Sequence, residues 1–280
     1  MTAKLWLIVN PASGSYSGEA VAQLRAAFAG AGAPVTRTLA AAAAAAGLPG
    51  RAEVEAEGVS LVAVYAGDGT VNSVATALEG WAGALLVLPG GTANLLAREL
   101  HGEREAAEIV ADHAALEPLR RDCIRYAGGT ALAEVLAGPG ATWSEVREEL
   151  REPDVGAVAG KAVAAIKEST VGPLVRLVEP ALGREEGYAG VRLAPQQGAM
   201  EVEGYGARTV GDYFRQGLAL LRRNFREGPH EELGHHREVL CRSVGEAPIA
   251  LMIDGERREG GAEERFSLAP FELDLLGRSP

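Results

Sequence analysis

The 280-residue chain has few of the features that mark secreted, metal-bound or membrane-spanning proteins. It contains only two cysteines, Cys123 and Cys241, which lie far apart and belong to no CxxC or Cys/His ligand spacing. The apolar run near the N-terminus, Leu5 to Val9, is too short for a signal peptide. No segment approaches the roughly 20 apolar residues that a membrane span needs. We therefore expect a reduced, cytoplasmic protein in which both cysteines serve packing.

Positive charge is also scarce. The chain has 27 Lys and Arg against 38 Asp and Glu, a formal net charge of −11. This excess of negative charge argues against a nucleic-acid partner, because nothing offsets repulsion from the phosphate backbone. It also argues against permanent docking on anionic membranes and leaves only a transient contact with the membrane surface. One small basic cluster, Arg222, Arg223 and Arg226, is more simply explained as the solvated face of a helix.

The first 120 residues alternate short apolar runs with helical patterns. The apolar runs predict strands over Leu5–Val9, Pro34–Leu39, Ser60–Tyr65 and Ala84–Leu88. The segments between and after them predict helices over Ser17–Ala29, Ala40–Ala46, Val71–Leu78, Ala93–Leu100 and Glu103–His113. Near-continuous apolar strands separated by helices are typical of a parallel sheet that is covered by helices on both faces. We therefore expect an α/β domain over residues 1–118.

After about Glu117 the pattern changes to short mixed segments rich in glycine and proline. These predict antiparallel strands over Tyr188–Leu193, Ala199–Glu203, Val239–Ser243 and Ile249–Ile253, and two inserted helices over Val158–Glu168 and Gly211–Arg226. We expect a β-rich, sandwich-like second domain over residues 119–280, with a C-terminal tail that could return to the first domain.

Three of the strand-to-helix junctions carry unusual loops, "VNPASGS", "AGDGTVN" and "LPGGTANLLAREL". The whole chain has only four asparagines, yet Asn10, Asn72 and Asn94 all lie in these loops. In a parallel sheet the three loops emerge on the same edge, where open α/β proteins bind ligands. Their glycines allow tight turns and close approach to a polyphosphate, and a lone acid, Asp68, is suited to the metal that accompanies one. Any one loop could be a plain turn, but the three together favour a phosphate site that is neither a P-loop nor a GxGxxG site.

In this order and spacing, "NPASGS", "GDGTVN" and "PGGTANLLAREL" resemble the catalytic domain of the diacylglycerol kinase and sphingosine kinase family of lipid kinases, and most of all its small soluble bacterial members. A late segment, "PIALMIDGERREGGAEERFSLAPFELDLL", resembles the segment that closes the family's fold. The resemblance implies an α/β nucleotide-binding domain, a β-rich second domain and an active site in the cleft between them.

The resemblance also implies roles for individual residues. The residues that would bind ATP are Asn10, Ser13, Gly14, Gly67, Gly69, Thr70, Gly91, Thr92 and Asn94. Asp68 would be a catalytic residue that helps to hold the ATP phosphates and acts on the Mg²⁺ ion. Asp254 and Glu256, in "DGE", would face the phosphates from the second domain, with Asp254 as the general base. The alternative for Asp254 is an Asp-Gly hairpin turn between two strands.

The sequence departs from the family pattern at three places. Ala66 stands at the usual first glycine of GGDGT, and Ser15 stands where some bacterial relatives have a basic residue. Gln196-Gln197-Gly198 replaces an acidic pair that helps some relatives bind a structural metal, so we do not expect that second metal site. Lys161 or Arg98 could supply positive charge near the phosphates.

The leading hypothesis is an ATP- and Mg²⁺-dependent lipid kinase that phosphorylates the hydroxyl of a diacylglycerol-like or sphingoid lipid. One alternative is NAD kinase, which shares a GGDG-type loop but uses an Asn-Glu or Asn-Asp pair that this chain lacks. Another is a nucleotide-binding module without turnover. The sequence does not name the lipid, and it leaves a homodimer open.

Overall fold

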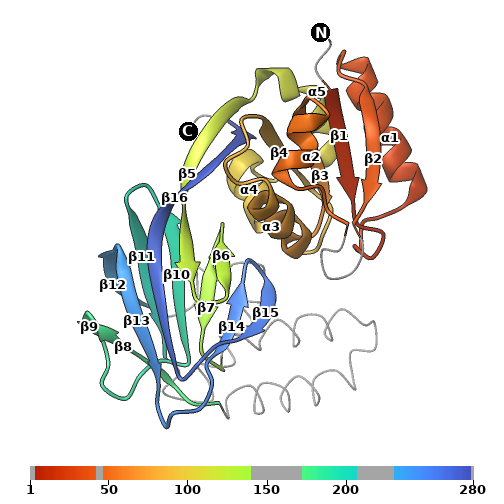
Figure 1. The fold of residues 1–280 in the computed structure, drawn as a ribbon. Coiled ribbons are helices and arrows are strands. Elements are labelled where there is room, and N and C mark those ends of the chain that lie inside the picture. The colour runs from red at the N-terminus through yellow and green to blue at the C-terminus, as the bar shows by residue number, and fades with distance from the viewer. Residues whose placement is uncertain (1–3, 42–46, 140–171, 207–229, 279–280) are drawn as a thin grey trace, which may run out of the picture. The chain divides into compact units, whose positions relative to one another are not determined.

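The computed structural model describes residues 4–41, 47–139, 172–206 and 230–278, which form two compact units (Figure 1). The first unit comprises Met1–Arg121 and Pro270–Pro280, and the second Asp122–Ala269. The chain passes between them within strands β5 (Glu117–Tyr126) and β16 (Glu263–Gly277). The first crossing lies close to the boundary expected near residue 118, and the part of β16 from Pro270 onward lies in the first unit.

The first unit is built on a parallel sheet in which the strand order is β2-β1-β3-β4. The strands are β1 (Lys4–Val9), β2 (Val35–Ala40), β3 (Val59–Ala66) and β4 (Ala84–Pro89). All four were predicted from their apolar runs. The end of β16 extends the sheet, because Asp274 pairs in parallel with Ala84 of β4.

Five α-helices and one 3₁₀ helix of the first unit are described. They are α1 (Gly18–Gly30), α2 (Arg51–Ala56), α3 (Asp68–Ala77), α4 (Leu95–His101), α5 (Ala106–Ala111) and η2 (His113–Ala115). Four of the α-helices match predicted helices, but α2 was missed because it is short and buries only Val54. Of the helix predicted over Ala40–Ala46, Ala40 instead ends β2, and residues 42–46 lie outside the described ranges.

Helices cover both faces of this sheet. Leu24 and Phe28 of α1 and Ile109 of α5 join one core cluster with Leu7 of β1 and Leu86 of β4. Alternate strand residues point to the other face, where α2 and α3 contact β3 and α4 contacts β4. The predicted α/β architecture is therefore confirmed.

The second unit contains two sets of strands. One is an antiparallel sheet with the order β12-β11-β10-β7-β14-β15. Its strands are β7 (Val135–Ala137), β10 (Gly190–Gln196), β11 (Ala199–Tyr205), β12 (Glu231–His236), β14 (Ala250–Ile253) and β15 (Glu256–Glu259). The other set joins β16 to β13 (Glu238–Ser243), β8 (Val175–Glu179) and β9 (Ala181–Leu182), while β5 pairs with β16 and with β6 (Gly129–Ala131).

A single apolar core lies between these two sets of strands. It includes Val191 and Val202 from the first set and Val239 and Phe266 from the second. The β-rich second domain is thus confirmed, with β10, β11, β13 and β14 near their predicted positions. The two predicted helices, Val158–Glu168 and Gly211–Arg226, lie outside the described residues.

Both cysteines are buried, and they form no disulfide bond with each other. Burial and, to a smaller extent, the charge of Glu264 together raise the pKa of the Cys241 thiol to about 12, so this thiol stays protonated at neutral pH. Within the described residues, no helix is long and apolar enough to cross a membrane.

Candidate functional site

The three glycine- and asparagine-containing loops lie at one edge of the first unit's sheet. They follow β1, β3 and β4, which are neighbours in the sheet and run in the same direction. The loops are also joined to one another. The Asn10 Nδ2 group donates a hydrogen bond to Thr70 Oγ1 at 2.9 Å, and the Gly67 N–H group donates to Ser13 Oγ at 3.2 Å. The loop after β1 is thereby fixed against the loop after β3.

The loops after β3 and β4 meet through their backbones. A Cβ atom added to Gly91 would lie 2.5 Å from Gly67 Cα, and one added to Gly90 would lie 2.5 Å from the Ala66 nitrogen. The packing of the two loops therefore already requires glycine at positions 90 and 91. Gly14 differs, because a Cβ atom there would have no atom within 4 Å. It leaves open space beside the loop after β1.

Asp68 lies where the loops converge, as the first residue of α3. Its Oδ1 atom accepts a hydrogen bond of 2.7 Å from the backbone N–H of Leu95, the first residue of α4. Its carboxylate therefore links the loop after β3 to the helix after β4. The sequence interpretation gave Asp68 a catalytic role at the ATP phosphates and their Mg²⁺ ion, and this structural contact was missed because it joins residues far apart in the chain.

Asn94 shapes the turn that precedes α4. It has a left-handed backbone conformation, with φ of 52°, which asparagine adopts more readily than most residues. Its side chain accepts a hydrogen bond from the Gly91 N–H at 2.8 Å and donates one to the Gly91 carbonyl at 3.0 Å. Thr92, between them, is exposed. The three loops that carry the site residues predicted in the first unit thus lie at one edge of the sheet.

Asp254, in the second unit, lies in the tight turn between β14 and β15. Ile253 pairs with Glu256 across the turn, and Asp254 and Gly255 have φ of 46° and 82°. A two-residue loop with both φ angles positive is a type I′ hairpin turn. Asp254 thus occupies the Asp-Gly hairpin that was the alternative reading of "DGE".

The Asp254 carboxylate is also strongly engaged, and the residue is only 4% exposed. It accepts backbone hydrogen bonds from Leu132 at 2.8 Å, Ala133 at 2.8 Å and Glu134 at 3.0 Å. These bonds fix the segment between β6 and β7 against the hairpin. Glu256, by contrast, is exposed at the start of β15.

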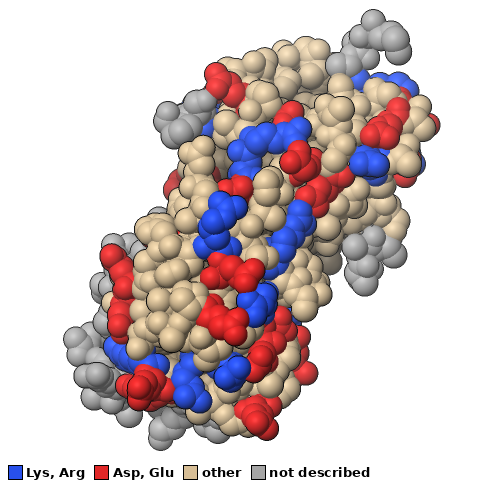
Figure 2. Space-filling view, turned by 60° about the vertical axis from the view of Figure 1, so that its left-hand side comes forward, with Lys and Arg blue, Asp and Glu red and all other residues tan. Residues whose placement is uncertain are grey.

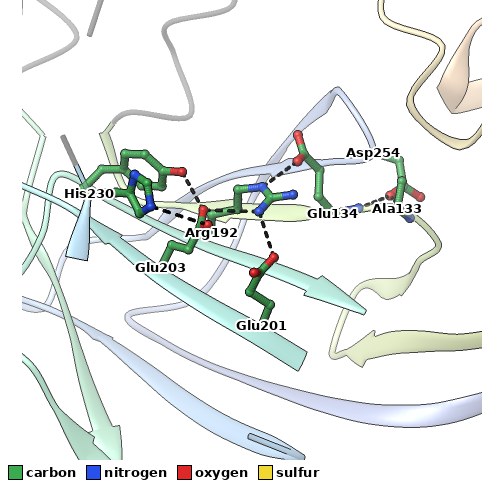
Figure 3. A network of polar contacts seen from close by, with 8 residues as sticks. Ala133, Glu134, Arg192, Glu201, Glu203, His230 and Asp254 are labelled. Carbon is green, nitrogen blue, oxygen red and sulfur yellow. Dashed lines mark hydrogen bonds and ion pairs between the residues drawn. The ribbon is translucent and has the colours of Figure 1, made fainter. Parts of the chain in front are cut away.

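A buried ionic network continues from Glu134 (Figure 3). Arg192 of β10 lies 2.9 Å from Glu134, 3.2 Å from Glu203 and 3.5 Å from Glu201. Burial alone would lower the pKa of the Arg192 guanidinium, but the charges of Glu134 and Glu203 raise it overall. The Tyr205 hydroxyl group donates to Glu203 at 2.6 Å. This network connects the segment held by Asp254 to β10 and β11.

The loops of the first unit have the donors that a polyphosphate needs, and the only Lys or Arg in the three motifs is Arg98, which lies in α4. The N-terminus of α3 has no side-chain cap, so its first turn can offer backbone N–H groups to an anion. Arg98 of α4 lies 3.4 Å from Glu103, and Lys161 lies outside the described residues. Backbone donors and hydroxyl groups are therefore the main donors that these loops offer.

The donor set also fits Mg²⁺. No group of three or more His, Cys, Asp or Glu side chains able to hold a metal occurs among the described residues. Mg²⁺ does not require such a cage, because it commonly binds through one or two carboxylates, substrate phosphates and water. The Gln196-Gln197-Gly198 segment forms a hairpin turn whose Gly198 N–H donates to Asp122 at 2.9 Å.

The fold as a whole matches known two-domain structures. The crystal structure of a diacylglycerol kinase from Bacillus anthracis str. Sterne aligns with 98% of this chain and 97% of its own, with a TM-score of 0.65 and 17% identity. A second structure from the same strain aligns with 99% of this chain and 97% of its own, with a TM-score of 0.61 and 17% identity. A third aligns with 98% of this chain and 95% of its own, with a TM-score of 0.63 and 16% identity. At these identities the likeness establishes the fold.

The sequence establishes more for the first unit. Residues 4–125 match the family model described as the diacylglycerol kinase catalytic domain. The resemblance to the diacylglycerol kinase catalytic domain that was drawn from the three motifs is therefore confirmed over these residues. The match includes all three loops but ends before Asp254 and Glu256. A comparison with curated proteins found no match.

Proposed function

We propose that the protein is an ATP- and Mg²⁺-dependent lipid kinase that transfers the γ-phosphate to the hydroxyl group of a diacylglycerol-like or sphingoid lipid. One observation carries the proposal. Three loops of a diacylglycerol kinase catalytic domain are bonded directly to one another, and Asp68 lies where they converge.

The loops would bind the nucleotide through backbone and hydroxyl donors. Thr70 and the first turn of α3 would contact phosphates, with Ser13 and Gly14 on one side and Thr92 and Asn94 on the other. Phosphoryl transfer needs little covalent help from the protein, so positioning and charge neutralisation supply most of the rate enhancement. The hydrogen bonds among the loops support this proposal because they hold the donors in place before ATP binds.

Asp68 would hold Mg²⁺, which neutralises phosphate charge when bound. Since one oxygen of Asp68 already accepts the Leu95 N–H group, this contact restricts the orientation of the carboxylate. The helix that carries Leu95 would thereby help to fix the metal ligand.

The acceptor hydroxyl needs a base or an orienting acid. We keep Asp254 as the candidate general base and Glu256 as the second acid, on the strength of the "DGE" resemblance. The three backbone bonds to Asp254 give it a structural function as well, so the two functions must be separated by experiment.

Contact with a membrane surface would be transient. Figure 2 shows a face on which acidic and basic side chains are interspersed and not segregated by sign. Many of these charges are paired, as in Arg242–Glu263 and Arg265–Glu238. The basic cluster Arg222, Arg223 and Arg226 lies outside the described residues.

Product identification tests the proposed function. The pure protein is incubated with γ-labelled ATP and Mg²⁺ and with one acceptor at a time: diacylglycerol in mixed micelles, sphingosine in mixed micelles, or NAD⁺. We expect label in a phosphorylated lipid. Label in NADP⁺ would establish the NAD kinase alternative. Saturable ATP binding without transfer to any acceptor would favour a nucleotide-binding module without turnover.

A further inference from the structure

Tyr65 contacts the loop after β1 although it lies in none of the predicted motifs. It is the penultimate residue of β3, directly before Ala66 and Gly67. Its hydroxyl group donates a hydrogen bond of 2.9 Å to the backbone carbonyl of Ser15, fifty residues earlier in the chain.

The ring of Tyr65 is firmly held. Tyr65 is 8% exposed and belongs to the core cluster that packs against α1 and α5. In the sheet Tyr65 lies between Val9, the last residue of β1, and Leu88, the penultimate residue of β4. Burial raises the pKa of the Tyr65 hydroxyl, and the charge of Glu105 raises it further, so the hydroxyl stays a donor at neutral pH.

The hydrogen bond to Ser15 fixes the far end of a loop whose near end is fixed elsewhere. Asn10 bonds to Thr70, and Ser13 accepts from Gly67, whereas Pro11, Ala12 and Gly14 are exposed. Between Ser13 and the start of α1 at Gly18, Tyr65 supplies a side-chain hydrogen bond from the sheet to the backbone of the loop.

We infer that Tyr65 is a positioning residue for nucleotide binding, which acts through the backbone at Ser15 to hold Ser13 and Gly14 in place. The inference rests on the proposed function, because it assigns Tyr65 to the ATP site of that proposal. Because the Tyr65 hydroxyl bonds to the backbone carbonyl of Ser15, we expect its loss to affect the affinity for ATP and not the chemical step.

The test is Tyr65→Phe, which removes the hydroxyl group and leaves the buried ring. We expect the KM for ATP to rise about two- to tenfold, the range that the net contribution of one neutral hydrogen bond allows, while kcat stays within about twofold. Tyr188→Phe is the matched control. Tyr188 is also buried and bonds to a backbone N–H, that of Arg184 at 3.2 Å, but it lies in the second unit. The Tyr188→Phe substitution should lower the melting temperature without changing the KM for ATP.

Hydrogen–deuterium exchange gives a second readout that needs no turnover. In the nucleotide-free protein, amides of peptides that cover residues 10–17 should exchange faster in Tyr65→Phe than in the wild type, and those in Tyr188→Phe should not. An unchanged KM together with unchanged exchange would overturn the inference. Faster exchange with no ATP turnover in the wild type would contradict the proposed function and leave the anchoring of the loop by Tyr65 in place.

Discussion

The Asp68 carboxylate accepts a hydrogen bond from the backbone N–H of Leu95, 27 residues further along the chain, at 2.7 Å. The contact couples the acid that we propose as the metal ligand to the first residue of α4. It also means that substitutions of Asp68 have two separable effects, one on charge and one on the hydrogen bond.

We expect Asp68→Asn to abolish phosphoryl transfer with little loss of stability, because an amide oxygen can still accept the Leu95 N–H while the negative charge needed for Mg²⁺ is gone. Asp68→Ala should also abolish transfer and should lower the free energy of unfolding by about 1.5–3 kcal/mol, the range for a hydrogen bond to a charged group. Turnover at saturating ATP and Mg²⁺, together with urea unfolding, measures both effects. Near-wild-type turnover by Asp68→Asn would remove Asp68 from the mechanism.

Gly91 is the second test. From the sequence alone, we expect Gly91 to let the nucleotide approach the backbone closely. On that interpretation, Gly91→Val should reduce ATP affinity more than it reduces thermal stability. The structure shows a closer constraint, the backbone of Gly67. We therefore expect Gly91→Val to lower both the melting temperature and ATP affinity. Gly14→Ala is the control, because it meets no neighbouring atom and should leave the melting temperature unchanged. A Gly91→Val protein with wild-type stability would mean that the two loops separate easily.

Asp254→Asn separates the two functions of Asp254. An asparagine keeps the Asp-Gly type of turn, but its NH₂ group replaces one of the two oxygens that accept from the 132–134 backbone. We expect the free energy of unfolding to fall by about 1–3 kcal/mol. If Asp254 is also the general base, kcat of the folded protein should fall by a factor on the order of 10² to 10⁴.

The comparison requires kcat to be measured well below the melting temperature of the variant, so that all molecules are folded. Glu259→Gln serves as a control, since it changes an exposed acid of the same hairpin that has no proposed role in catalysis. If folded Asp254→Asn turns over within tenfold of the wild type, Asp254 is an anchor for the 132–134 segment and the base must be sought elsewhere.

His101, at the end of α4, makes stability depend on pH. It is 4% exposed, and neither ring nitrogen has a hydrogen-bond partner. Burial lowers its pKa from 6.5 to about 4, and the charges of Arg104 and Arg278 act in the same direction. The nearby carbonyl of Val87 acts in the opposite direction and raises the pKa of His101, but it forms no hydrogen bond with either ring nitrogen. At neutral pH His101 is therefore uncharged in the folded protein.

Because the unfolded chain binds this proton more tightly, stability should fall as the pH drops from about 6.5 to about 4. The His101 contribution to that loss is on the order of 3 kcal/mol. His101→Leu should lack this part of the pH dependence and be at least as stable as the wild type at pH 7.5. The difference between the two proteins in urea unfolding at pH 7.5 and pH 4.5 isolates it from the titration of carboxylates. Parallel losses of stability would contradict this assignment.

Local patterns were sufficient to predict the elements that position the site. The strands β1, β3 and β4 are apolar runs, and a parallel sheet places the loops that follow them on one edge whatever the details of packing. Tertiary contacts could not be read in this way. Nothing near Asp274 indicates that it pairs with Ala84, and no local signal shows that Asp254 binds the backbone at 132–134. The hydrogen bond from Tyr65 to Ser15 was missed for the same reason.

The motifs also concealed why particular residues are present. Gly91 was assigned to the nucleotide, although the backbone of Gly67 already excludes any larger residue there. Asp68 was assigned to the metal, although it also binds the first residue of α4. In both cases the loops must first fit one another before they can bind a ligand, and sequence motifs do not distinguish these two requirements.

The central claim is that this catalytic domain transfers phosphate from ATP to a lipid hydroxyl. It is tested most directly by following the label of γ-labelled ATP into the lipid phase of diacylglycerol or sphingosine micelles, with and without Mg²⁺. We predict Mg²⁺-dependent formation of a labelled lipid by the wild type and none by Asp68→Asn. The absence of labelled lipid from a folded, ATP-binding wild-type protein, or equal labelling by both proteins, would contradict the account.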